Sequence, residues 1–300
     1  MIIPPYLKSS DRIRIVSPAG KINKNKVLPG IELLKNEGFE IIPGDHVSGS
    51  HYQFSGTDEE RLLDFQTALD DEKCKAIICS RGGYGTVRIA DKLDFESFQK
   101  NPKWLVGFSD ITVLHCMLQK LNISSIHGAM PGFFLKNEES TESYQALMQA
   151  LNGKKQSFEV EPHHLNRIGK CTGQLIGGNL SILYSLLGTP FEPETKGKVL
   201  FIEDLSEYLY HLDRIMHSFK LAGKLSQLNG LIVGGFSEMK DNDSKFGQSV
   251  EEIISDITKE YEFPVCFNFP AGHIARNLPL VIGAEYELTV SNRSSLKRIN

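Results

Sequence analysis

Three residues of the types that catalyse acyl transfer each follow an apolar stretch of this chain. Ser109 ends the run in "KWLVGFSDIT", Glu203 is the first polar residue after "VLFI", and His273 follows "FPVCFNFPAG". A serine hydroxyl attacks a carbonyl carbon when a histidine accepts its proton and a carboxylate orients that histidine. The pattern therefore indicates a serine hydrolase. We predict Glu203 as the orienting acid, in preference to Asp204 or Glu207, because a strand fixes its backbone.

Each of the three residues also has a purely structural interpretation. Ser109 lies between an expected strand over 103–108 and an expected helix over 110–121, where serine is a preferred N-cap. An acidic residue such as Glu203 is common in solvated loops, and a single histidine such as His273 is often structural. The joint pattern favours catalysis, because ligands bind at the strand ends of open α/β sheets.

The glycine-rich stretch "SRGGYG" (80–85) directly follows the apolar run "KAIIC". Glycines at such a turn let backbone N–H groups approach a developing anion, although a simple tight turn fits equally well. Neither GxGxxG nor GxxxxGK[ST] occurs, so a nucleotide loop is disfavoured. The α/β-hydrolase elbow G-x-S-x-G is met at Gly107 and Ser109 but not at Ile111, which disfavours that fold.

Strand and helix patterns alternate along the first half of the chain. "RIRIVSP", "FEIIPG" and "KAIICS" are predicted strands separated by amphipathic helices, one of which begins with a capping box at Thr57 and Glu60. This alternation predicts an α/β fold with a parallel sheet covered on both faces. We expect a first domain over 1–140, a polar linker over 141–168 and a smaller mixed α/β domain over 169–300. Within the last, "GGNLSILYSLLG" is a predicted helix and "EYELTVSNRSSLKRI" an antiparallel edge.

Composition excludes several classes of function. The 300 residues are 40% hydrophobic and carry a net charge of -4, without the basic excess of a nucleic-acid-binding protein. The start lacks an apolar signal core, and no stretch approaches the ~20 apolar residues that span a bilayer. Five scattered cysteines fit free thiols in a reducing compartment, and no CxxC or HExxH motif suggests a metal site. We therefore expect a cytoplasmic protein without cofactor, metal, membrane or nucleic-acid partner.

Several motifs in order resemble the LD-carboxypeptidases of the serine peptidase class, which include murein tetrapeptide carboxypeptidases and microcin C immunity proteins. The resemblance covers nearly the whole chain and rests on "SPAG", "SRGGYG", "VGFSDIT", "HGAMPG", "GGNLSIL", "FIEDLSE" and "AGHIARNLPLVIGA". It implies a flavodoxin-like N-terminal domain and a C-terminal α/β domain, frequently as a homodimer. It also implies roles for five residues: Ser109 as nucleophile, His273 as general base, Glu203 as orienting acid, and Gly83 and Asp110 as oxyanion-hole donors. Beside the glycines, Arg81 is a candidate partner for a substrate carboxylate or a plain surface arginine, and Tyr84 is a further candidate substrate contact.

The activity implied by this resemblance is hydrolysis of the amide between an L-centre and a terminal D-residue. The expected reaction releases D-alanine from cytoplasmic murein tetrapeptide during cell-wall recycling. One alternative is a microcin C immunity-like hydrolase of aminoacyl nucleotide analogues. An alternative of another class is a peptide-binding protein without catalytic activity. The sequence leaves open the residue before the scissile bond and whether glycan-linked muropeptides are accepted.

Overall fold

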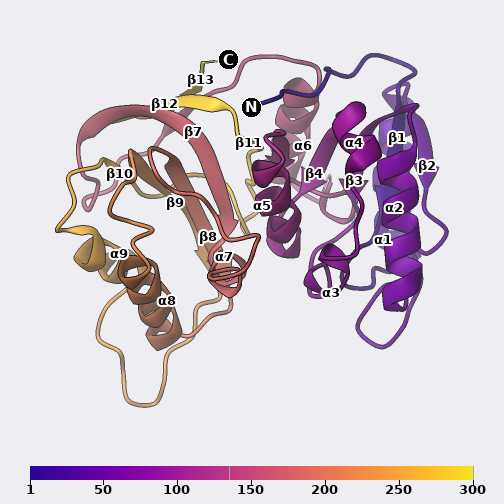
Figure 1. Ribbon diagram of the computed structural model, residues 1–300. Coiled ribbons are helices and arrows are strands. Elements are labelled where there is room, and N and C mark those ends of the chain that lie inside the picture. The colour runs from indigo at the N-terminus through magenta and orange to yellow at the C-terminus, as the bar shows by residue number, and fades with distance from the viewer. Residues whose placement is uncertain (135, 300) are drawn as a thin grey trace. The chain divides into compact units, whose positions relative to one another are not determined.

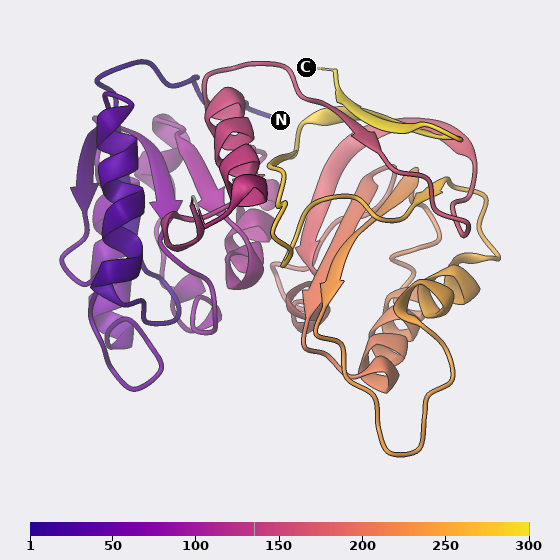
Figure 2. The ribbon, with the colours of Figure 1, turned by 180° about the vertical axis from the view of Figure 1, so that it is seen from behind.

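The computed structural model describes residues 1–134 and 136–299, which form two compact units (Figures 1 and 2). The first unit consists of residues 1–154 together with the returning segment 275–281. The second consists of residues 155–274 and the chain from 282 onward. Among the described residues, no helix has the length and apolar character needed to cross a membrane.

The first unit is built on a six-stranded sheet whose strands β1 to β5 are all parallel. Their order, β2-β1-β3-β4-β5, is that of flavodoxin-like folds, as predicted. In sheet order the strands are β2 (Glu40–Pro43), β1 (Arg12–Val16), β3 (Cys74–Cys79), β4 (Trp104–Gly107), β5 (Ser125–His127) and β11 (Leu280–Ile282). The central strands β3 and β4 bury nearly every side chain, which is typical of a parallel sheet covered on both faces.

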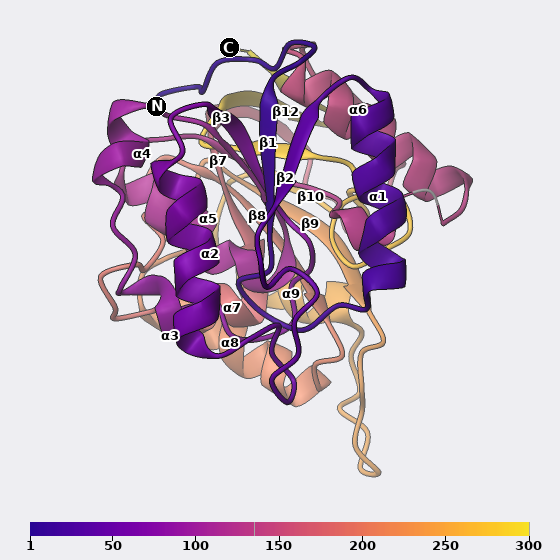
Figure 3. The ribbon, with the colours of Figure 1, turned by 90° about the vertical axis from the view of Figure 1, so that its right-hand side faces the viewer.

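Helices cover both faces of this sheet (Figure 3). One face carries α1 (Lys24–Asn36) and α6 (Glu138–Leu151), and the other carries α2 (Asp58–Asp70) and α5 (Thr112–Lys120), with the short α3 (Val87–Ala90) and α4 (Glu96–Lys100) on the same side. The predicted capping box is confirmed at the start of α2. Thr57 Oγ1 accepts from the Glu60 N–H at 3.2 Å, and Glu60 Oε2 accepts from the Thr57 N–H at 2.8 Å.

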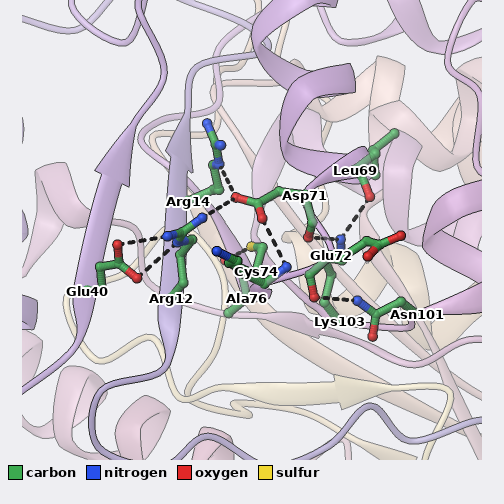
Figure 4. A network of polar contacts seen from close by, with 11 residues as sticks. Arg12, Arg14, Glu40, Leu69, Asp71, Glu72, Cys74, Ala76, Asn101 and Lys103 are labelled. Carbon is green, nitrogen blue, oxygen red and sulfur yellow. Dashed lines mark hydrogen bonds and ion pairs between the residues drawn. The ribbon is translucent and has the colours of Figure 1, made fainter.

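A polar network holds the amino ends of β3 and β4 at the end of α2 (Figure 4). The buried Lys103 donates from Nζ to the carbonyls of Leu69 and Asp71 at 2.8 and 2.7 Å. Burial alone would raise the pKa of the Asp71 carboxyl, but the 2.8 Å bond from Arg14 and further donors lower it below its usual value. This network fixes one edge of the sheet, and the loops that carry the candidate site leave from the opposite, carboxyl edge.

The second unit contains a mixed seven-stranded sheet. Strands β7 to β10 run parallel, whereas β7, β12, β13 and β6 pair antiparallel. The predicted tail is therefore antiparallel, but it does not form the edge of the sheet, because β6 pairs with β13 on its outer side. In sheet order the strands are β10 (Val265–Cys266), β9 (Gly230–Ser237), β8 (Val199–Leu205), β7 (Gly169–Asn179), β12 (Glu285–Val290), β13 (Ser294–Arg298) and β6 (Ser157–Val160). Its helices are α7 (Leu180–Ser185), α8 (Leu209–Leu221) and α9 (Val250–Thr258), the last two side by side in Figure 1.

The structure differs from two of our expectations in detail. The segment 141–168, which we predict as a linker, holds most of α6 in the first unit and β6 in the second. The predicted helix in "GGNLSILYSLLG" begins only at Leu180, because Gly177 and Gly178 complete β7. An added Cβ at Gly177 would lie 1.9 Å from the Phe201 carbonyl oxygen, so the strand needs glycine there to approach β8.

Candidate active site

Ser109 stands at a sharp turn from β4 into a 3-10 turn, Ser109–Ile111, that leads into α5. Its φ is +65°, in the left-handed region that a serine rarely adopts. The capping interpretation is wrong, because Phe108 occupies the N-cap position and no side-chain capping bond is formed. A non-glycine residue held in this conformation stores backbone strain, which is typical of functional sites.

The turn is possible because Gly107 has no side chain. An added Cβ at Gly107 would lie 2.9 Å from Cγ1 of Ile111, whose side chain therefore packs directly over the end of β4. Ile111 departs from the G-x-S-x-G elbow, yet it occupies the space that this glycine leaves. The backbone geometry thus resembles an elbow although the sequence motif is incomplete.

The glycine-rich loop after β3 packs against Ser109. An added Cβ at Gly82 would lie 2.8 Å from Ser109 Cβ and 3.0 Å from Oγ, so the two residues are in close contact. Gly83 has a φ of +106°, and its N–H donates to no other described residue of the first unit. Sequence reasoning singled out Gly83 and missed Gly82, for which the contact with Ser109 gives the only signal.

Asp110 ties this loop to the serine turn. Its Oδ2 accepts a 2.8 Å hydrogen bond from the Thr86 N–H, just beyond the loop. Burial raises the pKa of the Asp110 carboxyl, and its hydrogen bonds to Thr86 oppose that effect. The Asp110 N–H belongs to the first turn of a helix, where backbone donors lack an intrahelical acceptor.

The two expected substrate contacts, Arg81 and Tyr84, are both exposed. Arg81 Nη1 donates to the Lys21 carbonyl at 2.6 Å, which holds the guanidinium over the loop that follows β1. The Tyr84 ring lies 6.0 Å from the ring of Phe54. The guanidinium of Arg81 is therefore held in place by a hydrogen bond, whereas the Tyr84 ring has an aromatic neighbour in Phe54.

In the second unit, Glu203 and His273 form a hydrogen-bonded pair. Glu203 is fully buried on β8 and its Oε2 lies 2.7 Å from His273 Nδ1. The same oxygen accepts the His273 N–H at 3.1 Å. Burial alone would lower the pKa of His273, but the bond and the charge of Glu203 raise it above its usual value. The carboxylate thus favours a protonated Nδ1.

Small residues place His273 beside Glu203. Gly272 has a φ of +111°, and an added Cβ there would lie 2.7 Å from both Cβ and Oε2 of Glu203. The segment is bonded to β9 by the Gly235 N–H, which donates to the Ala271 carbonyl at 2.9 Å, and by Ser237 Oγ, which donates to the His273 carbonyl at 2.7 Å. Sequence reasoning did not single out these supporting residues.

The two rival carboxylates have other partners. Asp204 accepts from Asn179 Nδ2 and from the Ser181 N–H, both at 2.9 Å, at the start of α7. Burial raises the pKa of Asp204 to about 6. Glu207 Oε2 lies 2.5 Å from His211 Nδ1 on the next helix. Of the three acidic candidates, Glu203 is therefore the one hydrogen-bonded to His273.

The first unit thus carries Ser109, Gly83, Asp110, Arg81 and Tyr84, and the second carries Glu203 and His273. Within the described residues, no cluster of three or more His, Cys, Asp and Glu side chains is arranged to hold a metal ion. In chemical terms, the first unit holds a strained serine against a glycine-rich loop, and the second holds an imidazole oriented by a buried carboxylate.

Comparison with known proteins adds the following relatives. Models of the LD-carboxypeptidase N-terminal and C-terminal domains match residues 13–128 and 172–288. The chain is 32% identical over 300 residues to a probable murein peptide carboxypeptidase of Bacillus subtilis (strain 168), covering 98% of this chain and 93% of that protein. It is 29% identical to the murein tetrapeptide carboxypeptidase of Pseudomonas aeruginosa, with 89% of each covered. The solved structure of muramoyltetrapeptide carboxypeptidase from Oxalobacter formigenes matches with a TM-score of 0.88 at 28% identity, covering 96% and 99% of the two chains.

Proposed function

This chain belongs to the LD-carboxypeptidase family, and from that premise we propose that it is a serine carboxypeptidase acting on murein tetrapeptide. The bond cleaved is the amide between an L-configured centre and the terminal D-alanine. The release of D-alanine serves cell-wall recycling. The names of the relatives from Pseudomonas aeruginosa and Oxalobacter formigenes support the tetrapeptide as substrate.

In the proposed mechanism Ser109 is the nucleophile and His273 its general base. Because Glu203 holds the proton on Nδ1 of His273, the other ring nitrogen, Nε2, is the one that takes the serine proton. Ser109 Oγ forms a bond to the carbonyl carbon, and an acyl-enzyme follows when the C–N bond breaks. His273 gives its proton to the leaving amine of D-alanine and then activates the water that hydrolyses the ester.

The negative charge of the tetrahedral intermediate needs donors close to Ser109. The N–H groups of Gly83 and Asp110 are proposed for this role, since Gly83 lies in the loop that packs on Ser109 and Asp110 follows it in the chain. Removing one such donor typically costs ~3 kcal/mol of activation free energy. Arg81 and Tyr84 are proposed to contact the substrate from the same loop.

The observation that carries the proposal is the Glu203–His273 pair. A buried carboxylate bonded at 2.7 Å to an imidazole with 15% of its side chain exposed is the arrangement expected of a general base and its orienting acid. The strained backbone of Ser109 is the second supporting observation.

The test compares two peptides that differ only at the last stereocentre. We expect release of D-alanine from L-Ala-γ-D-Glu-(L-diamino acid)-D-Ala and almost no alanine from the peptide ending in L-Ala. A site that rejects the wrong isomer by leaving buried polar groups unpaired can discriminate by ~10⁴-fold or more. Equal rates on both peptides would exclude an LD-carboxypeptidase while leaving a serine hydrolase possible.

Two further outcomes address the alternatives. An active-site-directed fluorophosphonate should label Ser109 in the wild-type protein and not in Ser109→Ala, since a binding protein has no reason to hold an activated serine. Turnover of an aminoacyl nucleotide analogue without turnover of tetrapeptide would assign the microcin C immunity-like activity instead.

We also propose a cytoplasmic homodimer, as the family resemblance implies, and light scattering of the purified protein tests the dimer.

A further inference from the structure

The first unit contains a cavity of about 660 Å³, and of its lining residues the proposed function uses Arg81 alone. This volume lies within the range of roughly 300–1,000 Å³ typical of small-molecule sites. The lining residues come from the segments that follow four parallel strands: Lys21, Ile22, Asn23, Lys24 and Lys26 after β1, 48–50 after β2, Arg81 after β3, and Gly132, Phe133 and Lys136 after β5. The buried Ile22 side chain packs on Gly132, and both residues line the cavity.

The lining is strongly cationic in a chain whose net charge is -4. Five cationic side chains line the cavity, and none of its described lining residues is acidic: Lys21, Lys24, Lys26, Arg81 and Lys136. None of the five forms an ion pair within the described residues of the first unit. Like charges gathered without counter-charges repel one another, and a concave low-dielectric wall concentrates their field.

Two of these lysines stand where a cation is electrostatically unfavourable. Lys24 and Lys26 lie in the first turn of α1, which carries no acidic residue and whose N-terminus bears partial positive charge. By contrast, the first turn of α2 holds three acidic residues, Asp58, Glu59 and Glu60. Such a departure from local electrostatic preference is expected where the chain is adapted to a ligand. An anion in the cavity would remove both unfavourable interactions.

The cavity also lies where this topology binds ligands. The chain leaves β1 toward β2 on one side, and β3 pairs with β1 on the other side, so the strand order reverses between β1 and β3. Ligands of open α/β sheets bind beyond the carboxyl ends of the strands at such a switch point. Arg81 connects the cavity to the serine loop, because its neighbour Gly82 packs on Ser109.

We propose that this cavity binds a group carrying two or more negative charges, as carboxylates or phosphate. Arg81, held by the Lys21 carbonyl, and Lys136, whose Nζ lies 4.3 Å from the centre of the Phe133 ring, supply the positioned charges. Lys21, Lys24 and Lys26 complete the cationic wall. The group has two possible sources: the non-terminal carboxylates of the peptide, which rests on the proposed function, or a phosphate on a larger ligand, which does not.

The test uses a triple variant, Lys24→Gln, Lys26→Gln and Lys136→Gln, and a matched control, Lys73→Gln, Lys92→Gln and Lys120→Gln. The control removes three exposed lysines of the same unit that lie outside the cavity. Calorimetric titration with inorganic pyrophosphate measures the phosphate arm. The KM for tetrapeptide, and for tetrapeptide with its non-terminal carboxylates amidated, measures the carboxylate arm.

Pyrophosphate binding that the cavity variant weakens roughly tenfold or more, and the control leaves unchanged, supports the phosphate source, because charge-assisted hydrogen bonds are strong. A similar rise in KM for the native tetrapeptide, absent for the amidated one, supports the carboxylate source. If both variants behave alike in both arms, the cavity is not an anion site. The titration needs no turnover, so it decides the matter even if the protein cleaves no tetrapeptide.

Discussion

One carboxylate oxygen, Oε2 of Glu203, accepts hydrogen bonds from both the ring Nδ1 and the backbone N–H of His273, at 2.7 and 3.1 Å. The two bonds fix the ring and the segment that carries it to the same atom. Rotation of the imidazole alone would break the 2.7 Å bond from Nδ1, while the 3.1 Å bond from the backbone N–H would stay in place. Because both bonds end on this one oxygen, a substitution of Glu203 tests directly whether the carboxylate orients His273.

Glu203→Gln is expected to lower kcat by roughly 10³–10⁴-fold, because the amide no longer favours the productive tautomer of His273. The control is Glu207→Gln, which removes the partner of His211 and should leave kcat within a few-fold of wild type. Initial rates of D-alanine release from tetrapeptide measure both. A larger loss in Glu207→Gln would reassign the orienting role.

The pH profile of kcat/KM should report the raised pKa of His273. The imidazole must be neutral to accept a proton, so activity should rise with pH through an apparent pKa above ~6.5. In Glu203→Gln the residual activity should rise at lower pH, because the interaction that raises the pKa is gone. The same shift means that the pair stabilises the fold below pH ~6.5, and this contribution is lost as the pH rises through the folded-state pKa. An unchanged acid limb in the variant would separate Glu203 from the base.

Ser109→Gly and Ser109→Ala should both lose turnover, but only the glycine variant should gain stability. At a φ of +65° an L-residue is strained by roughly 1–2 kcal/mol, and glycine is not. Part of this gain is offset by the entropy of glycine in the unfolded chain, which leaves a net increase of about 0.5–1 kcal/mol over Ser109→Ala. Urea denaturation measures the difference. Equal midpoints would show that the strain is relieved by neighbouring residues.

Gly82→Ala should impair turnover far more than substrate binding. The new methyl group meets Ser109 Cβ at 2.8 Å and must push the serine away, and a displacement of about 1 Å can cost ~10²-fold in rate. Gly128→Ala is the control, because its methyl group would meet only side-chain atoms, at 3.3 Å or more. Single-turnover and steady-state rates of both variants separate kcat from KM. A Gly82→Ala enzyme with normal kcat would show that the loop yields instead of the serine.

Asp204→Asn should change how stability depends on pH. Burial raises the pKa of Asp204 from 3.8 to about 6, so between these values the folded state holds more protons than the unfolded state. The wild type therefore loses stability from this group as the pH rises from about 4 to 6, by about 1 kcal/mol per pH unit at most. The variant lacks this slope, so its deficit relative to wild type should be largest near pH 4. Denaturation midpoints at pH 4, 5, 6 and 7 test the expectation.

Local features of the fold could be read directly from the sequence. The capping box of Thr57 and Glu60 depends on two residues that are three positions apart in the chain. The strand in the tail could be predicted from the alternation of apolar and polar residues, which matches the alternating burial along β12. The α/β class follows from the alternation of such elements. These properties are set within a few residues, where the chain has few ways to satisfy its backbone and bury its apolar face.

The surroundings of each candidate residue were decided by tertiary structure. Gly82 meets Ser109 only because β3 and β4 are neighbours in the sheet, and Glu203 meets His273, 70 positions away, because the 271–274 segment runs beside β9. The cationic cavity gathers loops after four strands whose order in space differs from their order in the chain. Such contacts depend on which distant segments of the chain pack together. A local pattern of residue types does not determine that packing, because it reflects only the few residues on either side of each position.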